Sequence, residues 1–258
     1  MERGKRGELG GSLPPWDIRE YATLDSTNLE ARRLLDAGAR EGLVVTARHQ
    51  TGGRGRMGRG WFDLPGKSLM FSAVLAGVDG FAAAAIVALS MLSAVVELGG
   101  RGPELKWPND LVYGNRKVGG VLSESCAVGG KELVIVGLGL NVGYLPGELD
   151  MDARLTPTSL LVEEGRTWDL AELLNASLRG LRERWEAGPE AWRDEYRAHL
   201  AYLGERVTVN KPFAVAGRPG KNEEALSGVM RGVAGDGSLL LEVDGELLRV
   251  LSGDMAGR

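Results

Sequence analysis

Arginines alternate with glycines in the nine-residue segment 53–61. Glycine lets backbone N–H groups approach a ligand and adopts a positive φ at little steric cost. Arginine supplies charge-assisted hydrogen-bond donors that fit the oxygens of a phosphate or a carboxylate. Trp61 ends the segment and offers a flat indole for stacking on a base. These residue types suit a loop that binds an anionic nucleotide or an acyl phosphate. The segment is Gly53, Arg54, Gly55, Arg56, Met57, Gly58, Arg59, Gly60 and Trp61.

Two better-known glycine motifs fit this segment poorly. Its glycines satisfy G-x-G-x-x-G after a strand-like run at 43–47, but a dinucleotide site needs a helix that begins on the last glycine. The residues that follow, including the Pro65-Gly66 pair, do not favour a helix. The run from Gly60 to Ser68 is not a phosphate-binding loop, because its glycines lie one residue too far apart. A basic surface loop without a specific ligand is the remaining alternative.

A second polar cluster, residues 106–110, reads Lys-Trp-Pro-Asn-Asp and comes before a short apolar run and the turn signal Gly114-Asn115. The turn predicts a hairpin that carries Asp110 and Lys117 on paired strands. A carboxylate and an ammonium would then form a charge pair near one site. Taken alone, the lysine and aspartate of this cluster would be solvated strand ends, and its tryptophan would be a core residue.

A third run, residues 136–142, is typical of a buried strand that Gly137 and Gly139 interrupt. Glycines inside a strand suggest that the backbone approaches a ligand or a neighbouring segment closely. In this order the clusters resemble one family, the biotin–protein ligases, from about Tyr21 to the C-terminus. The residues that carry the resemblance are Asp25-Ser26-Thr27-Asn28, Gln50 with the arginine–glycine segment, Lys106-Trp107-Pro108-Asn109-Asp110, Lys117 with Gly119-Gly120, and Gly137, Gly139, Asn141 and Val142.

The resemblance implies an enzyme that forms biotinyl-5′-AMP from biotin and ATP. It then transfers biotin to a lysine of a biotin carboxyl carrier protein or of the biotinyl domain of a carboxylase. ATP and biotin are the implied substrates, Mg²⁺ is an implied cofactor, and a homodimer formed through the sheet is one implied oligomeric state. Two alternatives stay open. One is a lipoate or octanoate ligase or transferase of related fold, where Cys126 would be the transferase nucleophile. The other is a regulator that holds biotinyl-adenylate without transferring it.

The family's motifs imply a role for each matching residue. Lys117, Arg54, Arg56 and Asp110 are expected to be catalytic, because both steps gather negative charge near one phosphorus and the carrier lysine must lose a proton. Asp110 is also the candidate metal ligand. The residues expected to bind biotin are Ser26, Thr27, Asn28, Gln50, Gly53, Arg54, Gly55, Arg56, Lys117, Gly119 and Gly120. The residues expected to bind the nucleotide are Arg56, Trp61, Lys106, Asn109, Lys117 and Asn141, with Trp61 stacked on adenine.

Composition bounds the location and partners of this 258-residue chain, which has 43% hydrophobic and 26% charged residues. These fractions are typical of a soluble globular protein. The net charge of −4 offers no global basic surface, so no nucleic-acid partner is expected. The single cysteine predicts a reducing, cytoplasmic location. Residues 1–15 lack the apolar core of a signal peptide, and the apolar run at 81–98 is short for a membrane span, so it predicts a buried helix.

The pattern of apolar residues and turn signals predicts an α+β fold, in which helices pack on a mixed β-sheet and a small β-barrel follows. The resemblance implies that the sheet belongs to a class II synthetase-like catalytic domain and that the barrel is SH3-like. A helix is expected to begin at a cap formed by Thr27-Asn28 and to end at Gly38. Other helices are expected at 81–98, 169–186 and 189–202. Strands are expected at 43–48, 68–75, 104–107, 110–113, 117–125 and 132–142, and in the barrel at 207–209, 226–229, 239–243 and 247–251.

Three regions follow from this pattern. Residues 1–20 are expected to be a flexible N-terminal segment, residues 21–203 the catalytic biotin- and ATP-binding domain, and residues 204–258 the SH3-like domain. Some members of the family carry an N-terminal helix-turn-helix domain and act as repressors. Only about twenty residues precede Tyr21. A monofunctional ligase without operator binding is therefore expected.

Overall fold

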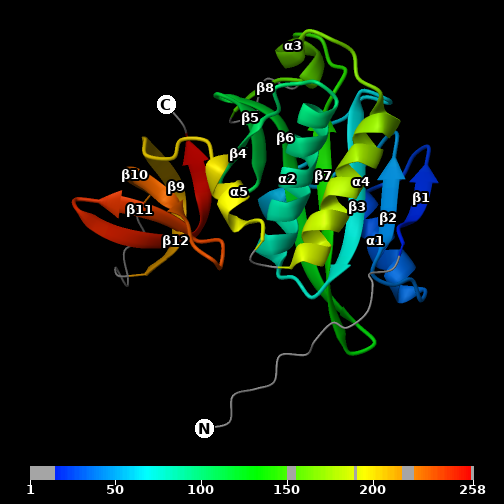
Figure 1. Cartoon of the computed structure of the whole chain (residues 1–258), viewed down its shortest axis with the longest axis horizontal. Coiled ribbons are helices and arrows are strands. Elements are labelled where there is room, and N and C mark those ends of the chain that lie inside the picture. Colours follow the sequence, from blue (N-terminus) through cyan, green and yellow to red (C-terminus); the bar gives the residue numbers. More distant parts are fainter. Residues whose placement is uncertain (1–14, 150–154, 189–190, 217–223, 257–258) are drawn as a thin grey trace.

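The computed structural model describes residues 15–149, 155–188, 191–216 and 224–256 (Figure 1). The helices are α1 (Thr27–Asp36), the 3₁₀ turn η1 (Arg56–Gly58), α2 (Gly80–Glu97), α3 (Leu160–Glu164), α4 (Leu170–Ala187) and α5 (Arg193–Ala198). The strands are β1 (Asp17–Tyr21), β2 (Leu43–Ala47), β3 (Ser68–Ala76), β4 (Glu104–Lys106), β5 (Asp110–Tyr113), β6 (Arg116–Val128), β7 (Lys131–Asn141), β8 (Thr156–Pro157), β9 (Arg206–Ala216), β10 (Ala225–Val233), β11 (Leu239–Val243) and β12 (Glu246–Ala256).

One mixed sheet forms the centre of the larger part of the molecule. Its strand order is β1-β2-β3-β7-β6-β5-β4, and β8 pairs with β6 off this path. The β1–β2 and β6–β8 pairs are parallel, and the remaining pairs of this sheet are antiparallel. The strands lie close to the predicted positions, so the α+β expectation is confirmed. The sequence pattern did not predict β1, and β1 uses residues 17–20 of the segment expected to be flexible. Residues 1–14 of that segment lie outside the described part of the chain.

Helices α2 and α4 cover one face of the sheet (Figure 1). The N-terminal Gly80 of α2 lies against Ser123 of β6, which identifies this face as the one that the odd-numbered residues of β6 share. Helix α2 is apolar on all sides because the sheet and α4 enclose it. Among the described helices it alone is long and apolar enough to cross a membrane, but 72% of it is buried inside the fold. The prediction of a buried helix at 81–98 is therefore confirmed.

The N-cap of helix α1 lies one residue before the predicted cap. Ser26 is the N-cap, and Thr27 and Asn28 are the first helical residues. Their side chains do not cap the helix, because they form hydrogen bonds with Gln50 and Ser72 instead. The predicted cap was therefore wrong, while the chain leaves the helix near the predicted Gly38, which has φ of +102°.

The predicted helix at 189–202 is much shorter than expected. Residues 189–190 lie outside the described residues, and α5 has six residues with Trp192 as its N-cap. The chain leaves the helical conformation because its backbone pairs with β4 after Ala198. His199 O accepts a hydrogen bond from Leu105 N at 2.9 Å, and Ala201 N donates one to Leu105 O at 2.9 Å. Tertiary backbone pairing thus overrides the helical pattern of this segment.

Strands β9 to β12 close into an antiparallel barrel of order β10-β11-β12-β9, as predicted, although three of the strands are longer than expected. The turn before β11 docks on the sheet domain. There Trp107 Nε1 donates to Gly237 O at 2.9 Å, and a Cβ at Gly237 would lie 2.6 Å from Phe81 Cγ. Phe81 also makes edge contacts with Trp192 and Tyr196, with centroids 5.8 and 5.5 Å away. The barrel is therefore packed against the part of the sheet that carries the 106–110 cluster.

Candidate active site

Glycines on β6 and β7 form an open floor on the face of the sheet opposite α2. Gly139 pairs with Met70 and Gly120, and residues that pair directly across strands share a face. A Cβ at Gly139 would lie 2.5 Å from Trp61 Cε2, and on the α2 side of the sheet a Cβ at Gly119 would lie 2.8 Å from Gly139 O. Side chains at these positions would collide with the indole or with the neighbouring strand. The glycines therefore allow close approach to the sheet, as the interrupted strand pattern suggested.

A chain of buried polar side chains lies beside this floor. The Oε1 atom of Gln50 accepts hydrogen bonds from the Thr27 backbone N at 2.7 Å and from Thr27 Oγ1 at 3.1 Å. The Ser72 hydroxyl donates to Asn28 Oδ1 at 2.6 Å and lies 2.8 Å from Thr27 Oγ1. Ser26, Thr27 and Asn28 are almost fully buried. The structure thus brings together the polar residues that were expected to bind biotin.

The arginine–glycine loop folds over these polar residues as a closed turn. Trp61 N donates to Gly53 O at 2.8 Å, and Gly55 N donates to Arg59 O at 2.7 Å. A Cβ at Gly53 would lie 2.5 Å from Trp61 O, so this close crossing of the two ends of the loop requires glycine. The loop therefore holds its arginines and its indole at fixed places around the site.

Each arginine of the loop contacts a residue outside the loop. Arg54 pairs with Glu124 of β6 at 3.2 Å. Arg56 reaches Asn109 Oδ1 at 3.3 Å and the Ser252 hydroxyl of β12 at 3.2 Å. Desolvation by burial lowers the pKa of Arg56. Guanidiniums held in this way are preorganised to meet a second anion with little further loss of side-chain freedom.

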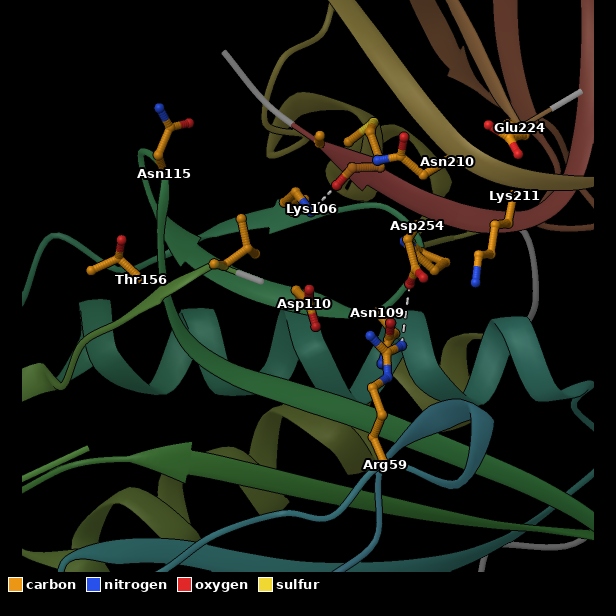
Figure 2. Close-up of a pocket in the computed structure, with 14 residues that line it drawn as sticks. Arg59, Lys106, Asn109, Asp110, Asn115, Thr156, Asn210, Lys211, Glu224 and Asp254 are labelled. Atoms are coloured by element: carbon orange, nitrogen blue, oxygen red, sulfur yellow. Dashed lines mark hydrogen bonds and ion pairs between the residues drawn. The ribbon is translucent and has the colours of Figure 1, made fainter. Parts of the chain in front are cut away.

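Arg59 makes the third of these contacts, to Asp254 of β12 at 3.2 Å. Because β12 belongs to the barrel, both Arg56 and Arg59 link the loop to a part of the chain far away in sequence. Figure 2 shows the Arg59–Asp254 pair at one end of a cavity between the sheet and the barrel.

The hairpin of β5 and β6 presents the predicted charge pair. Gly114 takes a φ of +58° in the turn, and Lys117 Nζ lies 2.5 Å from Asp110 Oδ1. A Cβ at Gly120 would lie 3.3 Å from Lys117 Nζ and 3.5 Å from Asp110 Oδ1. Both charged groups therefore face the edge of the glycine floor, and neither side chain is fully exposed. The prediction of a paired carboxylate and ammonium is confirmed.

Lys106 is not the solvated strand end that its sequence context alone would favour. Its side chain is buried, and its ammonium donates to the backbone O of Met255 in β12. Desolvation by burial lowers the pKa of Lys106, whereas the nearby Asp110 carboxylate raises it. The core position of Trp107 is as the sequence suggested. Lys106 therefore places a desolvated positive charge between the sheet and the barrel.

Two amides were also expected to bind the nucleotide. Asn109 Nδ2 donates to the backbone O of Val121 at 2.7 Å, and the Asn109 side-chain oxygen therefore faces Arg56. Asn141 is buried at the end of β7, and its amide donates to Thr158 O at 3.0 Å. Asn109 lines both cavities of the site, whereas Asn141 lines neither of them.

Two adjoining cavities divide the residues of the site. The smaller, of about 50 Å³, lies over the glycine floor. It holds little more than a water molecule, whose share of liquid volume is about 30 Å³, so the loop must move to admit a bicyclic ligand. Trp61 lines it, and the buried indole N–H has no acceptor among the described residues. Besides Trp61, the expected site residues that line it are Ser26, Thr27, Asn28, Gln50, Arg54, Gly55, Asn109 and Gly120.

The larger cavity, of about 780 Å³, opens between the β4–β5 region and the barrel. Polar side chains from both parts face each other across it in Figure 2, with Lys106, Asn109 and Asp110 on the sheet side and Lys211 and Asp254 on the barrel side. A volume of this size is in the range of small-molecule binding sites. The larger cavity lies next to the narrow one, and Asn109 lines both. Together they form a site with a narrow inner pocket over the glycine floor and a wider, charged outer pocket.

Several contacting residues have no obvious signal in the sequence. Glu124 lies on β6 two positions beyond Leu122 and joins Asn28 to Arg54. Ser252 and Asp254 come from the end of the chain, and only the closed barrel brings them to the loop. Glu124 could have been found from the period-two spacing that puts it on the same face as Gly120.

The fold and the motifs match known proteins. The Biotin/lipoate A/B protein ligase family matches residues 21–141. A biotin–[acetyl-CoA-carboxylase] ligase from Mycobacterium tuberculosis is 31% identical over 267 residues, covering 98% of this chain and 94% of that protein. One from Paracoccus denitrificans is 33% identical over 233 residues, covering 85% of this chain and 92% of that protein. The solved structure of biotin protein ligase from Aquifex aeolicus in complex with biotin and ATP superposes with a TM-score of 0.73 at 27% identity, covering 93% of this chain and 97% of that one.

Proposed function

The chain belongs to the biotin–protein ligase family, and we propose that it forms biotinyl-5′-AMP from biotin and ATP and transfers biotin to a lysine of a biotin carboxyl carrier protein. One observation carries the proposal from the geometry. Arg54 lines a narrow pocket floored by strand glycines, Arg56 contacts Asn109 at its edge, and the Lys117 ammonium lies beside Gly120 of the same pocket. A flat ring system with a carboxylate tail fits such a pocket, since the tail would meet the cations.

The first step requires electrostatic stabilisation of its transition state. The carboxylate of biotin attacks the α-phosphorus of ATP, the acyl phosphate bond forms, and pyrophosphate leaves. Negative charge gathers on the oxygens around the phosphorus, where fixed positive groups in a water-poor site stabilise the transition state most. Lys117 and Arg56 are suited to this role, because both are partly buried and held by hydrogen bonds or ion pairs. Lys106 would add a third positive charge on the side of the leaving phosphates.

The second step asks for a base and for an oriented amine. The ε-amine of the carrier lysine attacks the acyl carbon, AMP leaves, and the amine gives up a proton. A free lysine has a pKa near 10.4 and is protonated at neutral pH. Asp110 can take up that proton, because it borders the larger cavity and lies beside Gly120 at the edge of the smaller one.

Adenine is expected to stack on Trp61, whose indole lies over Gly139 in the ligand-free chain. An indole turned outward from this position would clear the narrow cavity for biotin and offer its freed face to the base. The unpartnered indole N–H supports such a movement, since a buried donor without an acceptor is unfavourable. Asn109 would contact the phosphate between the two cavities, and Asn141 would support the end of β7.

Mg²⁺ is expected to arrive with ATP as a phosphate complex. Among the described residues no three His, Cys, Asp or Glu side chains gather as a metal site. Mg²⁺ usually keeps several waters and uses one or two carboxylates together with substrate phosphates. Asp110 fits that pattern as a carboxylate on the sheet side of the larger cavity.

Pyrophosphate exchange into ATP is the direct test. Biotin should drive exchange, and lipoate and octanoate should not, if this proposal is right. Biotin-dependent labelling of a carrier domain should follow in the same preparation. Exchange with lipoate or octanoate instead of biotin would contradict the proposal, and exchange without carrier labelling would favour the alternative of a regulator that keeps its adenylate.

A substitution at Cys126 tests the remaining alternative, an acyl transferase with a cysteine nucleophile. It lies farther along β6 than Gly120, by ~20 Å of strand at the usual rise per residue. Burial raises the pKa of its thiol, which disfavours the reactive thiolate. Cys126→Ser should therefore leave carrier labelling unchanged, whereas a transferase would lose all activity.

Other expectations from the sequence stay predictions. We propose that residues 21–203 are the catalytic domain and that residues 204–258 are the SH3-like domain, because Gly204 takes a φ of +82° just before β9 begins. A cytoplasmic location, a homodimer and the lack of a nucleic-acid partner are likewise expected. Light scattering with and without biotin and ATP would measure the oligomeric state.

A further inference from the structure

Glu124 is the acidic residue that joins the two halves of the narrow cavity, and its carboxylate has two separate partners. Its Oε2 atom accepts a hydrogen bond from Asn28 Nδ2 at 2.7 Å. Its Oε1 atom pairs with Arg54 Nη2 at 3.2 Å. Asn28 belongs to the buried polar chain at the start of α1, and Arg54 belongs to the arginine–glycine loop on the other side of the pocket.

The orientation of the Asn28 amide depends on this carboxylate. An ionised carboxylate only accepts hydrogen bonds, so it forces the NH₂ group of Asn28 to face Glu124 and the backbone O of Leu122. The amide oxygen must then face the Ser72 hydroxyl, from which it accepts at 2.6 Å. The amide also sits directly over Gly137, where a Cβ would collide with Asn28 Oδ1. The absence of a side chain at Gly137 thus makes space for the amide in this position.

The groups beyond the amide are held by contact with Ser72 and by the backbone N of Thr27. Ser72 lies between Asn28 and Thr27, and both the backbone N and the hydroxyl of Thr27 donate to Gln50 Oε1. With its oxygen used in this way, Gln50 keeps its NH₂ group for other partners. Among the described residues that group reaches Met70 Sδ at 3.2 Å, a weak acceptor that an incoming carbonyl oxygen could replace.

We propose that Glu124 is a positioning residue for the acyl substrate, which sets the direction of the donors in the pocket and anchors the loop through Arg54. The inference rests on the proposed function, because the acyl substrate is taken to be biotin. A single carboxylate thus couples the buried hydrogen-bond chain to the loop that closes over it. Its negative charge attracts the Arg54 guanidinium, whereas its second oxygen accepts the hydrogen bond from Asn28.

Two substitutions separate these roles. Glu124→Gln keeps an acceptor oxygen for Asn28 and loses the negative charge that holds Arg54, while Glu124→Ala loses both. We expect the Kd for biotin, measured by calorimetry without ATP, to rise about tenfold in Glu124→Gln and about a hundredfold in Glu124→Ala, each tenfold step being ~1.4 kcal/mol. The Kd for ATP should stay within about twofold of the parent, since neither Asn28 nor Arg54 is among the residues expected to bind the nucleotide.

Loop cleavage gives an independent readout that needs no ligand. Trypsin cuts after arginine, and Arg54, Arg56 and Arg59 all lie in the loop. Initial cleavage in this loop should be several times faster in Glu124→Gln than in the parent, with an unchanged Tm. The matched control is Glu132→Gln, which removes the same charge from an exposed position of the neighbouring strand β7 and should change neither readout.

The outcomes are distinct. Glu124→Gln that binds biotin as tightly as the parent and is cleaved at the parent's rate would overturn the inference, as would equal weakening of biotin and ATP. If the parent itself bound no biotin, the proposed function would fall. The link from Glu124 to the loop would still be decided by the cleavage rates.

Discussion

Replacing Asp110 by asparagine should slow transfer to the carrier far more than it slows adenylate formation. The substitution keeps the shape of the side chain and removes its charge. At pH 7.4 a lysine with a pKa of 10.4 is neutral in about one molecule in a thousand. A positioned carboxylate that accepts the proton typically contributes 10²–10⁴-fold to the rate. A loss of about a hundredfold in the transfer step is therefore expected, at the low end because asparagine still orients the amine.

Adenylate formation should change much less. The first step needs the charge of Lys117, which the Asp110 carboxylate holds from 2.5 Å with 31% and 14% of the two side chains exposed. Without its partner the ammonium gains conformational freedom, so the cost is one of orientation. We expect a decrease of tenfold or less in pyrophosphate exchange, since exposed and half-exposed ion pairs contribute about 1 kcal/mol or less.

Single-turnover kinetics can separate the two steps. Parent and variant are loaded with purified biotinyl-adenylate, mixed rapidly with the carrier domain, quenched and scored for labelled lysine. The variant's rate should rise tenfold per pH unit up to the pKa of the carrier lysine, because the amine must then lose its proton to solvent. The reasoning is refuted if transfer from preformed adenylate is as fast in the variant as in the parent, or if exchange and transfer fall by the same factor.

Three further predictions follow from single contacts. Arg56→Gly removes the guanidinium that bridges the loop to β12, so the release of free biotinyl-adenylate should increase by about tenfold, and release equal to the parent's would contradict this role. Gly139→Ala puts a methyl group 2.5 Å from the loop indole and should weaken biotin binding at least tenfold by calorimetry, while Gly143→Ala, whose methyl would lie 3.9 Å from its nearest neighbour, should bind as the parent does. Glu163, whose pKa is lowered chiefly by its hydrogen bonds with Arg116, should stabilise the fold by ~1–3 kcal/mol at pH 7. In urea titrations the difference between the parent and Glu163→Gln should persist above the ordinary pKa of about 4.5 and disappear as the pH falls through the lower folded-state pKa; a difference that is the same at pH 3 and pH 7 would show that the charge is not responsible.

Local patterns were enough to predict the sheet and its charged hairpin. The turn signal at Gly114-Asn115 and the alternating apolar residues on both sides fix which residues pair, so Asp110 and Lys117 could be brought together without a structure. The glycines of β7 were recognised as a place of close approach for the same reason. Both conclusions need only the period of a strand and the sterics of one residue type.

Contacts between distant parts of the chain could not be predicted in this way. Asp254 lies 195 positions from Arg59, and nothing near either residue indicates that they pair. Taken alone, the sequence around Lys106 favours a solvated strand end, whereas the residue is buried here because the barrel covers it. The helix at 189–202 failed for a related reason, since backbone pairing of His199 and Ala201 with β4 ends α5 early. In each case the deciding partner comes from another layer of the fold.

The docking of the barrel turn on Trp107 and Phe81 has a consequence for how the molecule comes apart. Each of these aromatic side chains is covered partly by residues of the other domain, and the buried residues of both domains form one continuous apolar cluster. Removing the barrel would therefore bare the core side of the 106–110 cluster to water. Heating should melt both parts in a single cooperative transition. The barrel therefore stabilises the sheet part by covering some of its apolar core.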